Sequence, residues 1–147
     1  MTAQENPATA EAQGDAPMGS IATQFDVANW KVIAEEAGYV RVEVPLHPWL
    51  RNPLGQLFGG FTPSYADMLA FRVARSGDLA SRGSSIWYAT TGMRVDYLEP
   101  ITAEHFQVEC QLLKARGKSM LIETRFYQGD VLAAFAVVTI LVTTPPS

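Results

Sequence analysis

Residues 61–75 are the segment that most restricts how this 147-residue chain can fold. Apolar side chains recur there at the spacing of an α-helix, and others occupy the remaining faces of that helix. Only Asp67, Arg72 and Arg75 carry charge. A helix that is apolar nearly all round is a buried helix. The rest of the chain must therefore supply elements that cover it.

Segments with the pattern of β-strands precede and follow this helix in the sequence, and they can cover it. Residues 39–44 alternate between valine and charged side chains, which is typical of a half-buried strand. Four more runs follow the helix, and the last is apolar almost throughout, which favours a central or interface position. We expect these strands at residues 86–98, 105–113, 118–127 and 131–143. The pattern predicts an α+β fold, an antiparallel β-sheet wrapped around one long central helix, with the four later strands in a meander.

The N-terminal segment differs from the rest in composition. Residues 1–20 contain three acidic residues, no lysine or arginine, and almost no large apolar side chain. Such a segment buries too little surface to offset its ordering entropy, so we expect a disordered acidic tail there and a single domain over 21–147. A short N-terminal helix is predicted at residues 26–37, with Asp26 as its N-cap and Gly38 as its C-cap.

Charge and composition exclude several classes of function. Eleven lysines and arginines against fifteen aspartates and glutamates give a net charge of −4, which argues against nucleic-acid binding. The longest apolar stretch, residues 131–142, is too short to span a bilayer, and no secretory signal is evident, so we expect a cytoplasmic protein. The single cysteine, Cys110, is interpreted as a packing residue. Neither His47 nor His105 has a partner at metal-ligand spacing, so no metal site is predicted.

Residues 52–67 carry the candidate chemistry. The Gly59-Gly60 turn opens directly into the predicted helix, and glycine lets a ligand atom approach the backbone closely. The first N–H groups of a helix lack intrahelical acceptors, so they can stabilise an oxyanion, a contribution of about 3–4 kcal/mol. Asp67 lies one turn further along among apolar neighbours, which suits a base or a nucleophile. These residues equally fit an ordinary turn and a carboxylate that stabilises the helix dipole.

This stretch resembles the signature of the hotdog-fold acyl-CoA thioesterases of the phenylacetate-pathway and 4-hydroxybenzoyl-CoA type. That signature is Asn-x-x-Gly-x-x-His-Gly-Gly, followed seven residues later by an aspartate on the central helix. Its positions are occupied here by Asn52, Gly55, Gly59, Gly60 and Asp67. Val95-Asp-Tyr-Leu-Glu-Pro100 and the turn Arg116-Gly-Lys-Ser119 are also similar to the family. The resemblance covers residues 39–142 and implies the hotdog fold.

The resemblance further implies hydrolysis of an acyl-CoA or aryl-CoA thioester to the free acid and CoA, with no cofactor and no metal. Asp67 would be the nucleophile or the base that activates water, and both roles stay open. The Gly59 N–H would polarise the thioester carbonyl. Asn52 would position the attacking water or the carboxylate.

A hydroxyl on the strand after the helix assists catalysis in some members of the family. Alignment on Tyr97 assigns this position to Thr90. Simple alternation instead places Thr91 on the apolar face of the strand. A β-bulge at Gly92 would reconcile the two assignments.

Substrate contacts implied by the resemblance come from Phe58, Gly60 and the turn of Arg116, Gly117 and Lys118. The two cations suit charge-assisted hydrogen bonds to CoA phosphates, and they equally suit a solvated hairpin turn. Phe58 stands where the family has histidine, and a phenyl ring cannot donate or accept a conventional hydrogen bond. Three interpretations stay open: a packing substitution, a changed acyl pocket, or lost catalysis.

The family builds its site across a dimer interface. The resemblance therefore implies a homodimer or homotetramer in which Asp67 of one subunit faces loop residues such as Asn52 of the other, with acyl-CoA as the substrate. The alternative is a catalytically weak hotdog module that binds acyl-CoA as a sensor or scaffold, and Phe58 keeps this alternative open.

Overall fold

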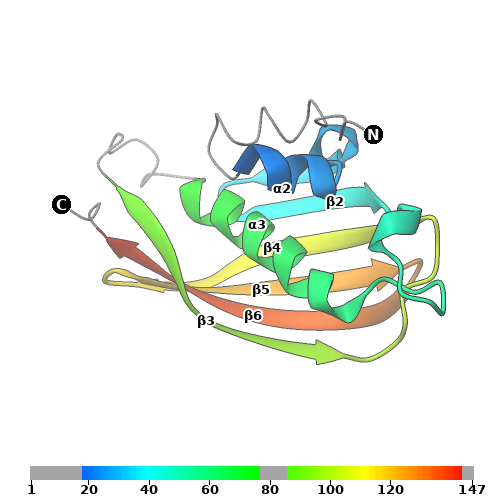
Figure 1. The fold of residues 1–147 in the computed structure, drawn as a ribbon. Coiled ribbons are helices and arrows are strands. Elements are labelled where there is room, and N and C mark those ends of the chain that lie inside the picture. The colour runs from blue at the N-terminus through cyan, green and yellow to red at the C-terminus, as the bar shows by residue number, and fades with distance from the viewer. Residues whose placement is uncertain (1–17, 77–85, 144–147) are drawn as a thin grey trace, which may run out of the picture. The chain divides into compact units, whose positions relative to one another are not determined.

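Six antiparallel strands form one continuous sheet in the computed structural model, which describes residues 18–76 and 86–143 (Figure 1). The strands are β1 (Lys31–Glu36), β2 (Tyr39–Pro45), β3 (Trp87–Tyr97), β4 (His105–Arg116), β5 (Ser119–Gln128) and β6 (Val131–Thr143). Their order across the sheet is β1-β2-β4-β5-β6-β3. The 14-residue helix α3 (Thr62–Arg75) lies along one face and contacts β2 to β6 (Figure 1). One antiparallel sheet around one long helix is the predicted fold class.

The chain divides into two units, Met1–Trp30 and Lys31–Ser147. The described part of the first unit contains the short helix α2 (Met18–Gln24) and a 3-10 turn, η1 (Val27–Asn29). Residues 1–17, which make up most of the predicted tail, lie outside the described residues. Neither described helix is long and apolar enough to cross a membrane.

The prediction of a helix over residues 26–37 is wrong. Most of this segment is the edge strand β1, which pairs with β2 and has all six residues exposed. Gly38 has φ +79°, and this left-handed conformation closes the hairpin between the two strands instead of ending a helix. Asp26 makes no side-chain capping bond. A short isolated helix is costly to nucleate, whereas the free edge of β2 offers β1 a full set of backbone partners. The short N-terminal helix is α2.

The predicted meander is wrong at β3. Strands β4, β5 and β6 follow one another as antiparallel neighbours, but β3 pairs with β6 at the far edge of the sheet. Alternation along a strand determines which side chains face the core, and it does not determine the partner strand. Strand β6 lies between β5 and β3, which confirms its predicted central position and accounts for its nearly continuous apolar sequence.

Helix α3 buries one face against the sheet. The buried residues of the helix are Thr62, Tyr65, Ala66, Leu69, Ala70, Val73 and Ala74. The Tyr65 ring packs edge-on against Phe106 and Phe126, with ring centroids 5.3 and 6.4 Å apart. Met68 and Phe71, on the opposite side, are only partly buried. The predicted helix is confirmed, and the sheet of a single chain covers one side of it.

Two polar contacts join the end of α3 to the β1–β2 hairpin. Arg72 donates two hydrogen bonds to the Glu35 carboxylate, at 2.5 and 2.8 Å, and these bonds lower the pKa of Glu35. The Gly38 N–H donates to Ser76 Oγ at 2.8 Å. Because the ion pair is largely exposed, it contributes little to stability, and its effect is to orient the helix on the sheet.

Replacing Phe126 tests the packing of α3 on the sheet. Phe126→Ala should lower the free energy of unfolding by about 3–5 kcal/mol, because the ring is fully buried beneath the helix. Urea denaturation followed by circular dichroism measures this change. Leu121→Ala, on the opposite face of the same strand, is the control and should cost less than about 1 kcal/mol. Equal losses in the two variants would contradict the assignment of the faces.

Candidate active site

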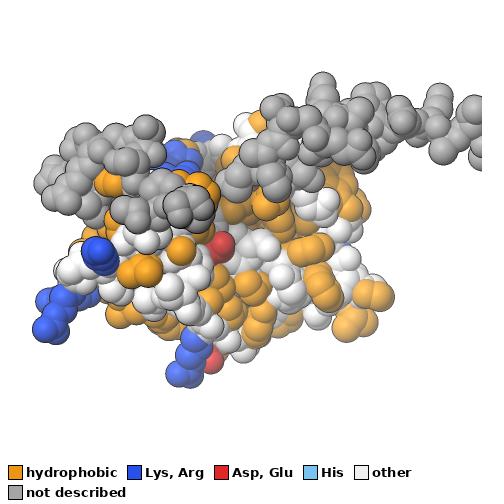
Figure 2. Space-filling model, turned by 60° about the vertical axis from the view of Figure 1, so that its left-hand side comes forward, with side chains coloured by type: hydrophobic (Ala, Val, Ile, Leu, Met, Phe, Trp, Pro, Cys, Tyr) orange, Lys and Arg blue, Asp and Glu red, His pale blue; other side chains and the backbone are white. Residues whose placement is uncertain are grey.

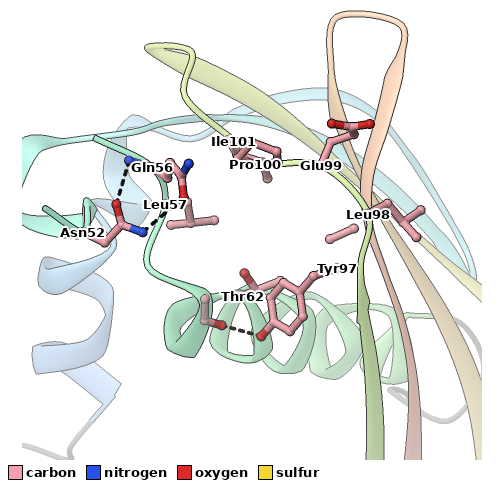
Figure 3. A pocket seen from close by; sticks show the side chains of 11 residues that line it. Asn52, Gln56, Leu57, Thr62, Tyr97, Leu98, Glu99, Pro100 and Ile101 are labelled. Carbon is pink, nitrogen blue, oxygen red and sulfur yellow. Dashed lines mark hydrogen bonds between the residues drawn. The ribbon is translucent and has the colours of Figure 1, made fainter. Parts of the chain in front are cut away.

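The loop before α3 is closed by the side chain of Asn52. Its Oδ1 accepts hydrogen bonds from the backbone N–H groups of Leu54 and Gln56, both at 3.0 Å, and its Nδ2 donates to Gln56 Oε1 at 3.3 Å (Figure 3). Arg51 also binds the loop, through the Gly55 carbonyl at 2.5 Å. Arg51 and Gln56 could not be predicted as part of this loop from the sequence, because their contacts depend on how the loop curls.

Gly59 and Gly60 present two unpaired N–H groups at the start of the helix. The turn η3 (Gly59–Phe61) leads directly into α3. The carbonyls of Phe58 and Gly59 accept from the N–H groups of Phe61 and Thr62. Neither glycine N–H donates to any residue that the structure describes. This is the arrangement expected of oxyanion donors.

Phe58 packs over this turn instead of pointing into the core. Its ring is half exposed and meets Phe61 edge-on, with centroids 5.2 Å apart. A Cβ on Gly60 would lie 2.6 Å from Phe58 Cε1, so the ring occupies the space beside the Gly60 backbone. The Phe58 ring therefore covers one side of the glycine turn.

Asp67 and Thr90 are brought together by α3 and β3. The Thr90 hydroxyl donates to Asp67 Oδ1 at 2.5 Å, and the aspartate is partly buried. The pairing of β3 with β6 shifts register between Thr90 and Gly92, so alternation is broken there. Thr91 points elsewhere and its hydroxyl approaches the carbonyl of Thr139 at 3.4 Å. Of the two threonines, Thr90 is the one that faces the carboxylate.

The two groups of candidate residues lie apart within one chain. Asn52 and Gly59 line a cavity of about 340 Å³, together with Thr62, Tyr97 and other residues (Figure 3). Neither Asp67 nor Thr90 lines it. Asp67 follows Gly59 by eight residues, which corresponds to about 12 Å along a helix. A single chain therefore does not bring the glycine turn and the carboxylate onto one carbonyl group.

The Arg116-Gly117-Lys118 segment forms an exposed hairpin turn between β4 and β5, with Gly117 at φ +59°. One row across the sheet joins Ala115, Met120, Ile140 and Thr90. The turn thus lies at the Thr90 end of the sheet, but two to three strands away, or about 10–14 Å.

Cys110 and the histidines stand outside these groups. Burial raises the pKa of the Cys110 thiol to about 12, and its sulfur lies 3.4 Å from the Thr124 hydroxyl, so the prediction of a packing residue is confirmed. The His47 ring stacks on Trp49, and His105 is exposed. The described residues contain no group of three or more histidine, cysteine, aspartate or glutamate side chains placed to hold a metal ion.

Large apolar side chains are exposed near both ends of the edge strand β3. Trp87, Tyr97 and Leu98 are each about half exposed. Figure 2 shows hydrophobic side chains spread over much of the face that it presents. Extended apolar surface of this kind is typical of an interaction site.

Comparison with known proteins identifies the family. The sequence model of the thioesterase superfamily matches residues 54–134, more than half of the chain. This chain belongs to the thioesterase superfamily. Among curated proteins, none matches the sequence closely enough to count as a relative.

Solved structures show that this superfamily member has the hotdog fold. A phenylacetic acid degradation-related protein from Ralstonia eutropha JMP134 is 19% identical, with a TM-score of 0.71 over 92% of this chain and 99% of its own. A Streptococcus mutans protein bound to acetyl CoA is 17% identical, with a TM-score of 0.68 over 81% and 92%. A mutant thioesterase from Pseudomonas aeruginosa is 14% identical, with a TM-score of 0.71 over 99% and 97%. Superfamily membership supports thioester hydrolysis as the general chemistry, and the resemblance found in the sequence is confirmed.

A double-mutant cycle tests the contact between Phe58 and Gly60 in this superfamily member. Gly60→Ala should lower the free energy of unfolding by about 1–3 kcal/mol, because its Cβ displaces the Phe58 ring. In a Phe58→Ala background, the same change should cost nothing or stabilise slightly, since the obstacle is gone and alanine favours the helix. Thermal and urea unfolding of the four proteins measure the coupling. Additive effects of the two substitutions would contradict the contact.

Proposed function

We propose that this chain hydrolyses an acyl-CoA or aryl-CoA thioester to the free acid and CoA, without a metal and with Asp67 as nucleophile or general base. The observation that carries the proposal is the hydrogen bond from Thr90 to Asp67, on a helix that follows a glycine turn whose Gly59 and Gly60 N–H groups have no acceptor among the described residues. The Streptococcus mutans neighbour is bound to acetyl CoA, which supports a CoA thioester as the ligand.

The geometry suggests how the reaction would proceed. The N–H groups of the glycine turn, Gly59 first, bind the thioester carbonyl oxygen and stabilise the negative charge that develops on it. Asp67 either attacks the carbonyl carbon or takes a proton from a water that attacks it, and the CoA thiolate then leaves. In the first case a mixed anhydride between Asp67 and the acyl group remains, and water hydrolyses it to the free acid and the aspartate. Because Thr90 binds Oδ1, it orients the carboxylate and leaves Oδ2 to react.

The remaining predicted residues take supporting roles in this proposal. Asn52 closes the loop, and the amide proton that Gln56 does not use can bind a water or the carboxylate. The half-exposed Phe58 ring beside Gly60 contacts the acyl group or the pantetheine arm of CoA. Arg116 and Lys118, at the exposed turn, bind CoA phosphates.

The proposed site is shared between two chains. A carbonyl oxygen must lie about 3 Å from its donors while its carbon meets the attacking oxygen, and the spacing of about 12 Å along α3 prevents one chain from doing both. We therefore propose a homodimer, or a homotetramer of two dimers, in which Asp67 of each protomer faces the glycine turn of its partner. The free edge of β3 and the exposed apolar side chains near its ends support such association.

Substitution of Asp67 and Thr90 tests the catalytic pair. Asp67→Asn should lower kcat by about 10²- to 10⁴-fold, because the base or nucleophile is lost. Thr90→Val should lower kcat by about 10- to 100-fold, because a hydrogen bond to a charged group is removed. Release of the CoA thiol from a panel of acyl-CoA and aryl-CoA substrates measures both, and the buried Cys110 thiol does not interfere.

Thr91→Val is the matched control, since its hydroxyl faces away from Asp67, and its kcat should stay within about twofold of wild type. Full activity in Asp67→Asn would exclude the proposed role of this carboxylate. A wild-type protein that binds CoA thioesters in calorimetry and releases no thiol from any of them would instead be the binding module, the outcome that Phe58 keeps open.

Mixing two inactive variants tests the shared site. Asp67→Asn and Asn52→Ala are defective in opposite halves of the proposed site, so a heterodimer of the two regains one intact site. Random pairing makes half of the dimers mixed, so co-expression should restore about a quarter of wild-type activity per dimer. Activity no higher than the average of the two parents would contradict a site built from two chains.

A further inference from the structure

We propose that Tyr97 is a positioning residue for the oxyanion donors. Its hydroxyl donates a hydrogen bond to the carbonyl of Gly59, and by holding this carbonyl it directs the N–H of Gly60 toward the substrate. This inference rests on the proposed function and adds a residue for which the sequence resemblance implied no role.

The contact joins two parts of the chain that lie 38 residues apart. Tyr97 ends β3, and its ring lies along the glycine turn, because a Cβ on Gly59 would meet the ring at 3.5 Å. Tyr97, Gly59 and Thr62 line the same cavity (Figure 3). The hydroxyl therefore acts on the carbonyl side of the Gly59–Gly60 peptide, beside a cavity that the described residues leave open.

Because a peptide unit is planar, the hydrogen bond to the Gly59 carbonyl also determines the direction of the Gly60 N–H. The carbonyl and the N–H of one trans peptide unit point in opposite directions, so fixing the Gly59 carbonyl also fixes the Gly60 N–H. The preceding unit is held in the same way, because the Phe58 carbonyl accepts from the Phe61 N–H. The Gly59–Gly60 unit is held by the Thr62 N–H and by one side chain, that of Tyr97.

The hydrogen bond from Tyr97 matters because the peptide that it holds lies between two glycines. Glycine adopts positive and negative φ with similar ease, so the dihedral angles of Gly59 and Gly60 resist rotation of the peptide between them only weakly, and the hydrogen bonds to the Gly59 carbonyl must hold it. A rotated peptide would turn its carbonyl toward the substrate and repel the oxyanion. The Tyr97 hydroxyl disfavours that rotation without occupying the position of the substrate oxygen.

Tyr97→Phe tests the role because it removes only the hydroxyl. We expect kcat to fall by about 10- to 30-fold, less than for the complete loss of a donor. The Kd of an S-alkyl CoA thioether, which lacks the carbonyl oxygen, should stay within about twofold of wild type. In ¹H–¹⁵N NMR spectra, the Gly59 and Gly60 amide signals should broaden or double. Tyr39→Phe is the matched control, since its hydroxyl also donates one hydrogen bond, to Glu109 at 2.7 Å, and it should change none of these readouts.

The outcomes separate this proposal from the proposed function. An active wild type whose Tyr97→Phe variant keeps its kcat would overturn the role of Tyr97 alone. A parallel loss of thioether affinity and kcat would also overturn it, since the tyrosine would then shape the pocket instead of orienting donors. A wild type that hydrolyses no thioester would overturn the proposed function and the catalytic meaning of Tyr97 together. Unchanged glycine signals in Tyr97→Phe would overturn the positioning role whatever the activity.

Discussion

The packing of α3 against the sheet places the carboxylate of Asp67, the residue on which the proposed chemistry depends. The Tyr65 ring extends from the helix and packs against the rings of Phe106 and Phe126. The buried face of the helix extends from Thr62 to Ala74. This burial fixes the rotation of the helix about its own axis. Asp67 is consequently held on the partly exposed side, close enough to β3 for Thr90 to reach it.

The same helix separates the two halves of the proposed chemistry. The glycine turn just before the helix offers the proposed N–H donors, and the carboxylate lies eight residues after Gly59, or about 12 Å along a helix. A rigid α-helix cannot shorten that distance, so a monomer can bind a thioester carbonyl or attack it, but not both. The outer edge of β3, which pairs with no strand of the described residues, and the apolar side chains near its ends would give the proposed second chain a surface to pair with. In the proposed mechanism, helix geometry therefore links catalysis to association.

Aromatic side chains determine the character of the glycine turn. Phe58 covers the Gly60 side of the turn, whereas Tyr97, at the end of β3, donates a hydrogen bond to the Gly59 carbonyl. The replacement of a family histidine by Phe58 removes a hydrogen-bonding group and adds apolar surface beside the proposed carbonyl site. The tyrosine supplies a hydroxyl at the same turn, where it orients backbone donors through the carbonyl and needs no direct contact with substrate.

Local pattern was enough to predict α3 and the strands β2 to β6, since their spans follow from side-chain periods of 3.6 and 2. It also singled out Asp67 and the glycine turn, because the family signature is contiguous in the sequence. The spacing of apolar side chains did not distinguish the edge strand β1 from a helix. It also could not predict that β3 pairs with β6, since the choice of partner strand depends on hydrogen bonds between distant segments. The register shift before Gly92 selected Thr90 over Thr91, and only the folded chain brings Tyr97 to Gly59. The sequence by itself determined which residue types were available and which element carried each of them. The tertiary structure decided which of them meet, because each such contact is made across strands and helices that no local spacing relates.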